Sequence, residues 1–279
     1  MKRAFIGLVI GALGCSGQGG VDITAQEAGA EDRDRVPQQD AAESAPDAAS
    51  DAKAQPADAS LGGVPPFGGS SSGKGGKVPV SGDVQQVSGI TYRLVVPGSY
   101  ANKPTPLLVV FSGVEGGAAM TNNLLTLGPQ TGIDSFVCAV LDGKVYNNNG
   151  GAGATALDDV RAHYDIDNDR TYLLSESAGT RSGLALGFQL RQSYFAAFWA
   201  NDVNFSGSPA QSAQALGFAP WGQAGPGGQF AIAGQIVQGM KVAGYRLPNP
   251  APYAGPGASM HGSVPQFIAA LSWLPGKTR

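Results

Sequence analysis

The stretch LDDVRAHYDIDNDRTYLLSESAGTRSG, residues 157–183, decides which fold we expect for this chain. It reads as a helix, a polar turn, an apolar strand and the start of a second helix. A strand that turns sharply into a helix strains the residue at the turn, so the residues two before and two after it must be small. Ser175 and Gly179 meet that requirement around Ser177. Ser177 is therefore a candidate nucleophile.

The polar turn of this stretch also has the spacing of a calcium-binding loop, with Asp165, Asp167, Asp169 and Glu176 in the ligand positions. Arg170 stands where such a loop needs glycine, and Glu176 lies inside the strand-to-helix turn. We therefore expect no metal here. Asp167 and Arg170 are interpreted as structural partners that fix the entry to the strand.

Apolar runs alternate with amphipathic or Gly-rich segments on both sides of this stretch. Alternation of this kind predicts an α/β fold, with a mostly parallel central sheet covered by helices on both faces. We expect strands at 91–97, 106–112, 136–142, 170–175, 195–201 and 229–234. Helices are expected at 154–163, 178–191, 235–243 and 263–274.

Residues 1–15 have the features of an export signal. A positively charged start precedes the apolar run 4–14, which is too short to span a bilayer. The run closes on Ala-Leu-Gly-Cys, which resembles the bacterial lipobox and predicts a lipid on Cys15. We expect an exported, membrane-anchored lipoprotein of the cell envelope or cell exterior. An ordinary secretory signal cut elsewhere is the alternative.

Residues 16–76 differ from the rest in composition. They are rich in Ala, Gly, Ser, Pro, Asp and Gln, and they hold ten acidic against four basic residues. Such a segment cannot bury a core and extends in solvent. We interpret it as a disordered tether, with an acidic interaction tail as the alternative.

Residues 77–279 form the expected folded domain. Its eleven acidic and twelve basic residues leave it nearly neutral, which argues against nucleic-acid binding. Cys138 lies in the apolar run SFVCAVL and is expected to be a buried core thiol. We expect a monomer without a cofactor.

Two parts of this domain resemble a known family. YRLVVPGSY with PTPLLVVFSG, and the stretch quoted above, are similar to secreted α/β-hydrolase esterases of the polyhydroxybutyrate depolymerase, feruloyl esterase and acetylxylan esterase type. The resemblance covers most of residues 89–274. It implies an α/β-hydrolase-like fold and a serine esterase that forms an acyl-enzyme on polyester or polysaccharide-linked esters.

The oxyanion hole of such an enzyme needs two backbone N–H donors. Ala178, directly after the nucleophile, is one candidate. The other is expected from Ser112 and Gly113, where the family usually has His-Gly and where a backbone donor makes the side chain unimportant. Glu115, two residues further on, would oppose an oxyanion unless its carboxylate points to water.

The catalytic base must be His261 or His163, because the chain has two histidines. His261 lies in a loop before the last expected helix, where the family places its base. His163 precedes the turn, on an expected surface helix.

The acid departs from the family pattern. The family takes its Asp from the loop after the strand expected at 229–234, and residues 234–237 contain no carboxylate. Asp202 is the only acid after Ser177 and is our candidate. A dyad, or an inactive surface protein with a binding or structural role, is the alternative. Trp221 and the loop 146–154 are interpreted as neighbours of the cleft, with core packing as the alternative for Trp221.

Overall fold

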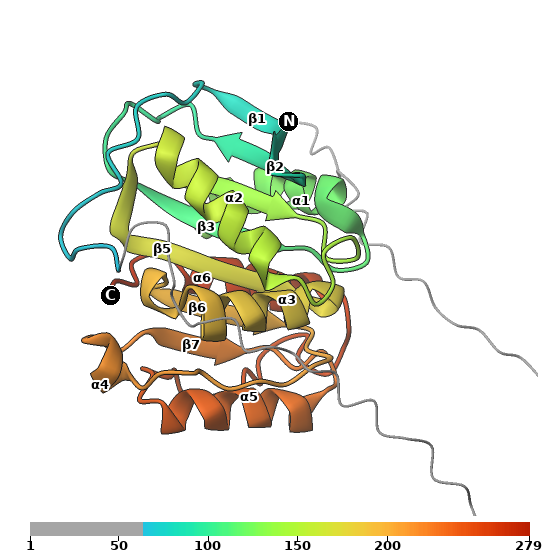
Figure 1. The fold of residues 1–279 in the computed structure, drawn as a ribbon. Helices are drawn as coiled ribbons and strands as arrows, with labels where there is room; N and C mark the ends of the chain where they lie inside the picture. The colour runs from blue at the N-terminus through green and yellow to red at the C-terminus, as the bar shows by residue number, and fades with distance from the viewer. Residues whose placement is uncertain (1–63) are drawn as a thin grey trace, which may run out of the picture. The chain divides into compact units, whose positions relative to one another are not determined.

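The computed structural model describes residues 64–279 of the chain (Figure 1). In chain order the described elements are β1 (Val80–Val87), β2 (Ile90–Val96), β3 (Thr105–Phe111), α1 (Gly116–Thr131), β4 (Val137–Leu141), α2 (Gly150–His163), β5 (Ile166–Glu176), α3 (Thr180–Ala185), β6 (Ala197–Asn201), α4 (Ala213–Leu216), β7 (Trp221–Ala224), α5 (Phe230–Val242) and α6 (Val264–Trp273). Five of the six predicted strands and all four predicted helices correspond to these elements, with shifted bounds.

The strands form one seven-stranded sheet in the order β1-β2-β4-β3-β5-β6-β7 (Figure 1). β1 pairs antiparallel with β2, and β2 pairs antiparallel with β4. The other pairs, from β4 to β7, are parallel. The carboxyl ends of five strands therefore meet at one edge of the sheet, which is where sites form in open parallel sheets.

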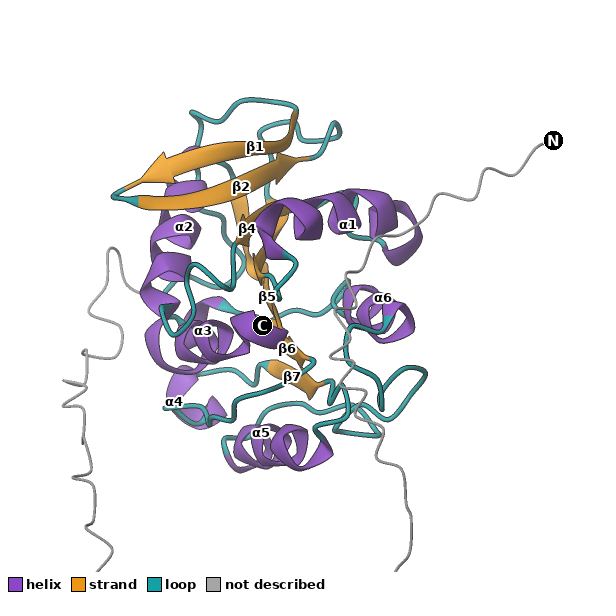
Figure 2. Cartoon of the chain, turned by 90° about the vertical axis from the view of Figure 1, so that its right-hand side faces the viewer, coloured by secondary structure: helices purple, strands orange, loops and turns teal. Residues whose placement is uncertain are grey.

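Helices cover both faces of the sheet, as predicted. α1 and α6 lie on one face, and α2 and α3 lie on the other (Figure 2). In β3, Leu107, Val109 and Phe111 belong to the core cluster that includes residues of α2, α3 and α5. Leu108 and Val110 belong to the cluster that includes residues of α1 and α6. β3 is buried along its whole length, which explains why its sequence is a continuous apolar run.

The strand predicted at 229–234 is wrong. Those residues begin α5, and the last strand of the sheet is β7 instead. The buried residues Ala233, Ile236, Val237 and Met240 have the three- and four-residue spacing of one helix face, and a six-residue window is too short to reveal it. β7 has a Gly and two polar or small residues in four positions and therefore carries little strand signal.

Trp221 does not lie at the site. It is the first residue of β7, so it sits at the amino end of a parallel strand, away from the edge where the site lies. Its ring lies under the guanidinium of Arg246 and the ammonium of Lys277. The packing alternative for Trp221 is the one that the structure supports.

Residues 64–76, predicted as part of the tether, pack on the domain. The Ser71 N–H donates to the Ile166 carbonyl at 2.8 Å, and the Gly68 N–H donates to the Asp169 carboxylate at 2.6 Å. Phe67 meets the ring of Phe218 edge-on. The predicted boundary at residue 77 is therefore wrong. This segment is held largely by backbone hydrogen bonds, and its composition gives no sign of them.

Cys138 is buried on β4, and burial raises the pKa of its thiol to about 12, as expected of an inert core thiol. Across residues 64–279, no helix is both long and apolar enough to cross a bilayer. Cys15 and the tether segment 16–63 lie outside the described residues.

Candidate active site

Ser177 lies at the turn between β5 and the helical segment that follows it. Its φ of 45° is in the left-handed region, which a residue with a side chain adopts only under constraint. The constraint comes from Gly179, where a Cβ would lie 2.5 Å from the Ser112 carbonyl oxygen and 2.7 Å from Phe111 Cβ. Only glycine lets the helix start this close to β3. The turn therefore has the backbone geometry that the sequence predicted.

Ser175, two residues before the candidate nucleophile, is accommodated by a glycine on the facing helix. A Cβ on Gly183 of α3 would lie 2.3 Å from Ser175 Cβ. Gly183 thus provides the space that a glycine at position 175 would otherwise provide. The serine substitution alters how strand and helix pack, but it leaves the turn intact.

His261 reaches Ser177 from the loop before α6. Its Nε2 lies 2.8 Å from Ser177 Oγ, a hydrogen-bond distance, although the two residues are 84 positions apart. His163 lies on α2 with its side chain half exposed, and its Nδ1 contacts the Asp159 carbonyl. The structure thus brings His261, and not His163, to the candidate nucleophile.

Asp202 follows β6 and is fully buried, with a φ of 48°. Its carboxylate accepts hydrogen bonds from the Gly262 N–H and from Nε2 of Gln266, rather than from the imidazole of His261. Burial raises the pKa of Asp202, while the Gly262 hydrogen bond, the charge of His261 and the Gln266 hydrogen bond lower it. Asp202 therefore fixes the loop that carries His261 and acts on the ring through its charge.

Gln266 is a site residue that the sequence analysis missed. It is fully buried in α6, where it bonds Asp202 and also accepts from the Gly227 N–H at 3.3 Å. A glutamine on the buried face of an otherwise apolar helix is the one signal that could have revealed it.

The structure distinguishes Ser112 from the other two oxyanion-hole candidates, Gly113 and Ala178. The Ser112 N–H donates to the Leu141 carbonyl at 3.0 Å in the sheet, so Ser112 is not available as a donor, and that part of the prediction is wrong. Ser112 Oγ instead accepts from the Gly143 N–H at 3.0 Å and holds two loops together. Gly113 lies against the nucleophile, since a Cβ on it would be 3.3 Å from Ser177 Cβ. Ala178 is at the start of a helical segment, where N–H groups have no partner within the helix.

Comparison with known proteins supports the architecture. At the sequence level, no protein-family model and no curated protein matches the chain. A thermostable esterase of known structure superposes with a TM-score of 0.52 at 15% identity, over 71% of this chain and 62% of that one. The chain has the α/β-hydrolase fold. At this identity the likeness establishes the fold alone, and the matched part spans 62% of the esterase's length.

Two further α/β-hydrolase structures are similar at a lower level. The poly(3-hydroxybutyrate) depolymerase LpqC from Bordetella parapertussis has a TM-score of 0.48 and 15% identity, over 68% of this chain and 85% of that one. A ferulic acid esterase from Anaeromyces mucronatus has a TM-score of 0.43 and 13% identity, over 66% and 83%.

Several acidic side chains lie around the candidate site. Glu176, the last residue of β5, is buried, and burial together with the charges of Glu115 and Asp202 raises its pKa well above the ordinary value. Asp142, at the end of β4, accepts from the backbone N–H groups of Lys144 and Val145. Among residues 64–279, no group of three or more potential ligands is arranged to hold a metal ion.

Asp167 and Arg170, the predicted structural partners at the start of β5, form an ion pair with a distance of 2.7 Å. The predicted pairing is confirmed, although both residues lie within β5 itself rather than in a turn before it. The loop after β4 runs to α2, which begins at Gly150, four residues earlier than predicted.

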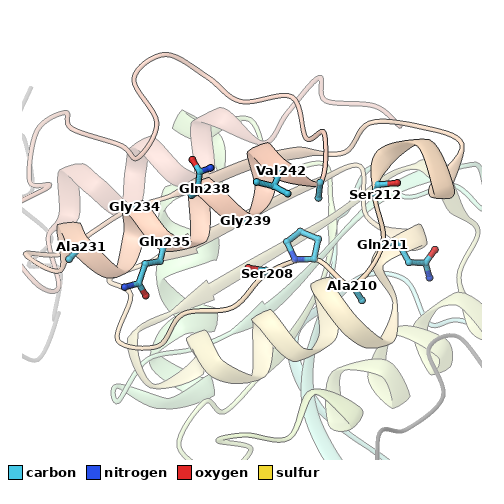
Figure 3. Close-up of a pocket in the computed structure, with 12 residues that line it drawn as sticks. Ser208, Ala210, Gln211, Ser212, Ala231, Gly234, Gln235, Gln238, Gly239 and Val242 are labelled. Atoms are coloured by element: carbon cyan, nitrogen blue, oxygen red, sulfur yellow. The ribbon is translucent and has the colours of Figure 1, made fainter.

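A separate groove of about 680 Å³ lies between α5 and residues 208–212 (Figure 3). Uncharged side chains line it, including Ser208, Gln235 and Gln238. Ser177, Asp202 and His261 do not belong to its lining. The groove is therefore distinct from the candidate catalytic site.

Proposed function

We propose that this chain is a serine carboxylic ester hydrolase. The observation that carries the proposal is the 2.8 Å contact between His261 Nε2 and Ser177 Oγ, made at a turn where Ser177 has a positive φ. A serine hydroxyl within hydrogen-bond distance of a base, held at a strained turn, is the arrangement that nucleophilic acyl transfer requires.

The mechanism follows from the atoms in contact. Ser177 Oγ attacks the ester carbonyl carbon while His261 Nε2 takes the hydroxyl proton. The tetrahedral intermediate collapses, His261 gives that proton to the leaving alcohol, and an acyl-enzyme remains. Water then attacks the acyl carbon with His261 as base, which releases the acid and restores Ser177. The N–H groups of Gly113 and Ala178 stabilise the oxyanion in both halves.

Asp202 supports the base in this proposal. Its negative charge stabilises the imidazolium that forms during each half-reaction. Its hydrogen bond from the Gly262 N–H fixes the backbone next to His261. Gln266 holds the carboxylate in place.

The substrate class and the location are further parts of the proposal. Polyesters or polysaccharide-linked esters are the substrates that the sequence resemblance favours. A lipid on Cys15 would place the enzyme on a membrane of the cell envelope. Membrane fractionation of wild type and of a Cys15→Ser variant tests the anchor, and equal solubility would contradict it.

One experiment tests the activity. Wild type should react with a fluorophosphonate probe and hydrolyse short p-nitrophenyl esters. Ser177→Ala should abolish both, His261→Ala should nearly abolish both, and Asp202→Asn should lower turnover by about 10²–10⁴. His163→Ala is the matched control and should retain the wild-type rate, because this histidine contacts Asp159 on α2.

If wild type neither reacts with the probe nor hydrolyses any ester, the proposal of an enzyme is contradicted. The alternative, an inactive surface protein, then remains. If Asp202→Asn leaves turnover unchanged while the other two variants behave as expected, the Ser177 and His261 assignments stand and the acid assignment fails.

A further inference from the structure

The carboxylate of Glu115 is bonded to one of the N–H groups proposed for the oxyanion hole. Its Oε1 accepts a hydrogen bond from the Gly113 N–H at 2.8 Å, the same N–H that the proposed function needs for the substrate. A Cβ on Gly113 would lie 2.5 Å from Glu115 Oε2 and 3.3 Å from Ser177 Cβ, so the carboxylate and the nucleophile lie against the same side of Gly113.

Helix capping does not explain this position. Glu115 is the N-cap residue of α1, where an acidic side chain ordinarily accepts from the first N–H groups of the helix. Its side chain makes no such bond. Asp142 contacts the Gly117 N–H at 3.3 Å in its place. The Glu115 carboxylate instead turns back, away from the helix, onto Gly113.

The side chain of Glu115 lies close to solvent. The residue is half-buried, so rotation of its side chain can carry the carboxylate into solvent.

The groups around Glu115 make its hydrogen bond to Gly113 sensitive to protonation. Burial raises the pKa of Glu115, the hydrogen bonds from its own backbone N–H and from Gly113 oppose that shift, and the charges of Asp142 and Asp202 add to it. Glu176 also interacts with it electrostatically, and His261 lies bonded to Ser177 nearby. An ionised carboxylate is the stronger acceptor, so protonation weakens its hold on Gly113.

We propose that Glu115 is a gate on the oxyanion hole, an internal competitor that the carbonyl oxygen of the substrate must displace from Gly113. The inference rests on the proposed function, since only acyl transfer gives that N–H its importance. Opening exchanges one hydrogen bond for another and breaks no covalent bond. When Glu115 is protonated, solvent supplies the proton.

Probe labelling measures the gate in the full chain. Glu115→Ala and Glu115→Gln should react with the fluorophosphonate faster than wild type, by about tenfold for Glu115→Ala, since one oxyanion donor is worth about 10²–10³ in rate. The ratio of variant to wild type should be largest at high pH, where Glu115 is ionised, and should fall toward one as the pH is lowered.

Asp142→Asn is the matched control. It removes a carboxyl group that acts on Glu115 through its charge but does not bond Gly113, so a general effect of site charge would raise its rate as much as in Glu115→Gln. Equal gains in the two variants, or Glu115 variants no faster than wild type at any pH, would overturn the gate.

A second measurement does not depend on activity. Labelling serine carbonyls with ¹³C and glycine nitrogens with ¹⁵N restricts the NMR spectrum to Ser-Gly pairs, among them Ser112-Gly113. The Gly113 amide should shift with pH in wild type and lose that titration in Glu115→Gln. If the fluorophosphonate labels no variant while the Gly113 amide shifts with pH, the proposed function is wrong and the Glu115–Gly113 hydrogen bond is present. A Gly113 amide shift that does not change with pH would contradict that hydrogen bond, and with it the gate.

Discussion

Glu176 shows at the scale of one residue how the site strains the fold. It is the buried last residue of β5, directly before Ser177, and its Oε2 has no hydrogen-bond partner within residues 64–279. A carboxyl group in such a place is stable when protonated and costly when ionised. The sequence placed Glu176 beside the nucleophile but gave no sign of its burial.

We expect Glu176→Gln to stabilise the protein at neutral and alkaline pH. The folded pKa is raised, so the contribution of the protonated group is fully present below the unfolded pKa and is lost as the pH rises through the folded value. The free energy of unfolding of wild type should therefore fall relative to the variant as the pH rises, by about 1.4 kcal/mol for each pKa unit of the shift.

Urea titrations at a series of pH values measure this difference. Asp83→Asn removes a carboxyl group from an exposed position and is the control. Parallel curves for wild type and Glu176→Gln would show that the buried carboxyl costs nothing.

At the scale of elements, the crossing of β5 and α3 depends on a pair of small residues. Ser175 on the strand faces Gly183 on the helix, where a Cβ would lie 2.3 Å from Ser175 Cβ and 2.5 Å from its Oγ. The helix can approach the strand only if one of the two positions is glycine.

Gly183→Ala should therefore destabilise the fold by about 1–3 kcal/mol through overpacking, and adding Ser175→Gly should recover much of that loss. Thermal unfolding of the two single variants and the double variant gives the coupling. Gly234→Ala is the control, because a Cβ on Gly234 of α5 meets nothing within 4 Å. A double variant no more stable than Gly183→Ala would show that the clash lies elsewhere.

Element prediction failed where the local pattern was weak. β3 and β4 have continuous apolar runs and were predicted to within one residue of their bounds, because strands buried on both faces need no polar side chains. β5 was predicted only over its second half, and it begins four residues earlier, at Ile166, in the polar run that was interpreted as a turn. β7 and α5 were confused because β7 is only four residues long and α5 begins with the apolar run that a buried strand would also have.

At the scale of the whole molecule, Arg279 holds the segment at 64–67 against the domain. Its guanidinium bonds the carboxylate of Asp169 at 2.9 Å and the carbonyls of Pro65 and Pro66 at 2.9 and 3.0 Å. It also lies over the ring of Phe67 at 4.6 Å. One side chain thus joins two regions more than 200 positions apart in the sequence.

Arg279→Ala should lower stability by about 1.5–3 kcal/mol, the range for hydrogen bonds to a charged group. It should also speed trypsin cleavage after Lys74 and Lys77, which wild type should resist because the backbone around them is bonded to the domain. Lys241→Ala, which changes an exposed basic residue, is the control. Rapid cleavage at Lys77 in wild type would contradict packing of residues 64–76.

The sequence by itself determined the fold class and the two residues at the centre of the site. Ser177 and Gly179 specify the turn because its conformation depends on the sizes of neighbouring residues, and the order of apolar runs specifies a parallel sheet. The resemblance to the esterase family, which places its base in the loop before the last helix, pointed to His261.

Only the tertiary structure decided how those residues are supported. Asp202 bonds Gly262 and Gln266 rather than the imidazole, and Glu115 turns onto Gly113 rather than to water. Which donor each carboxylate reaches depends on how strand ends and loops pack in space, because a buried charge takes whichever N–H groups the packing brings near it. Residue order along the chain does not encode that choice.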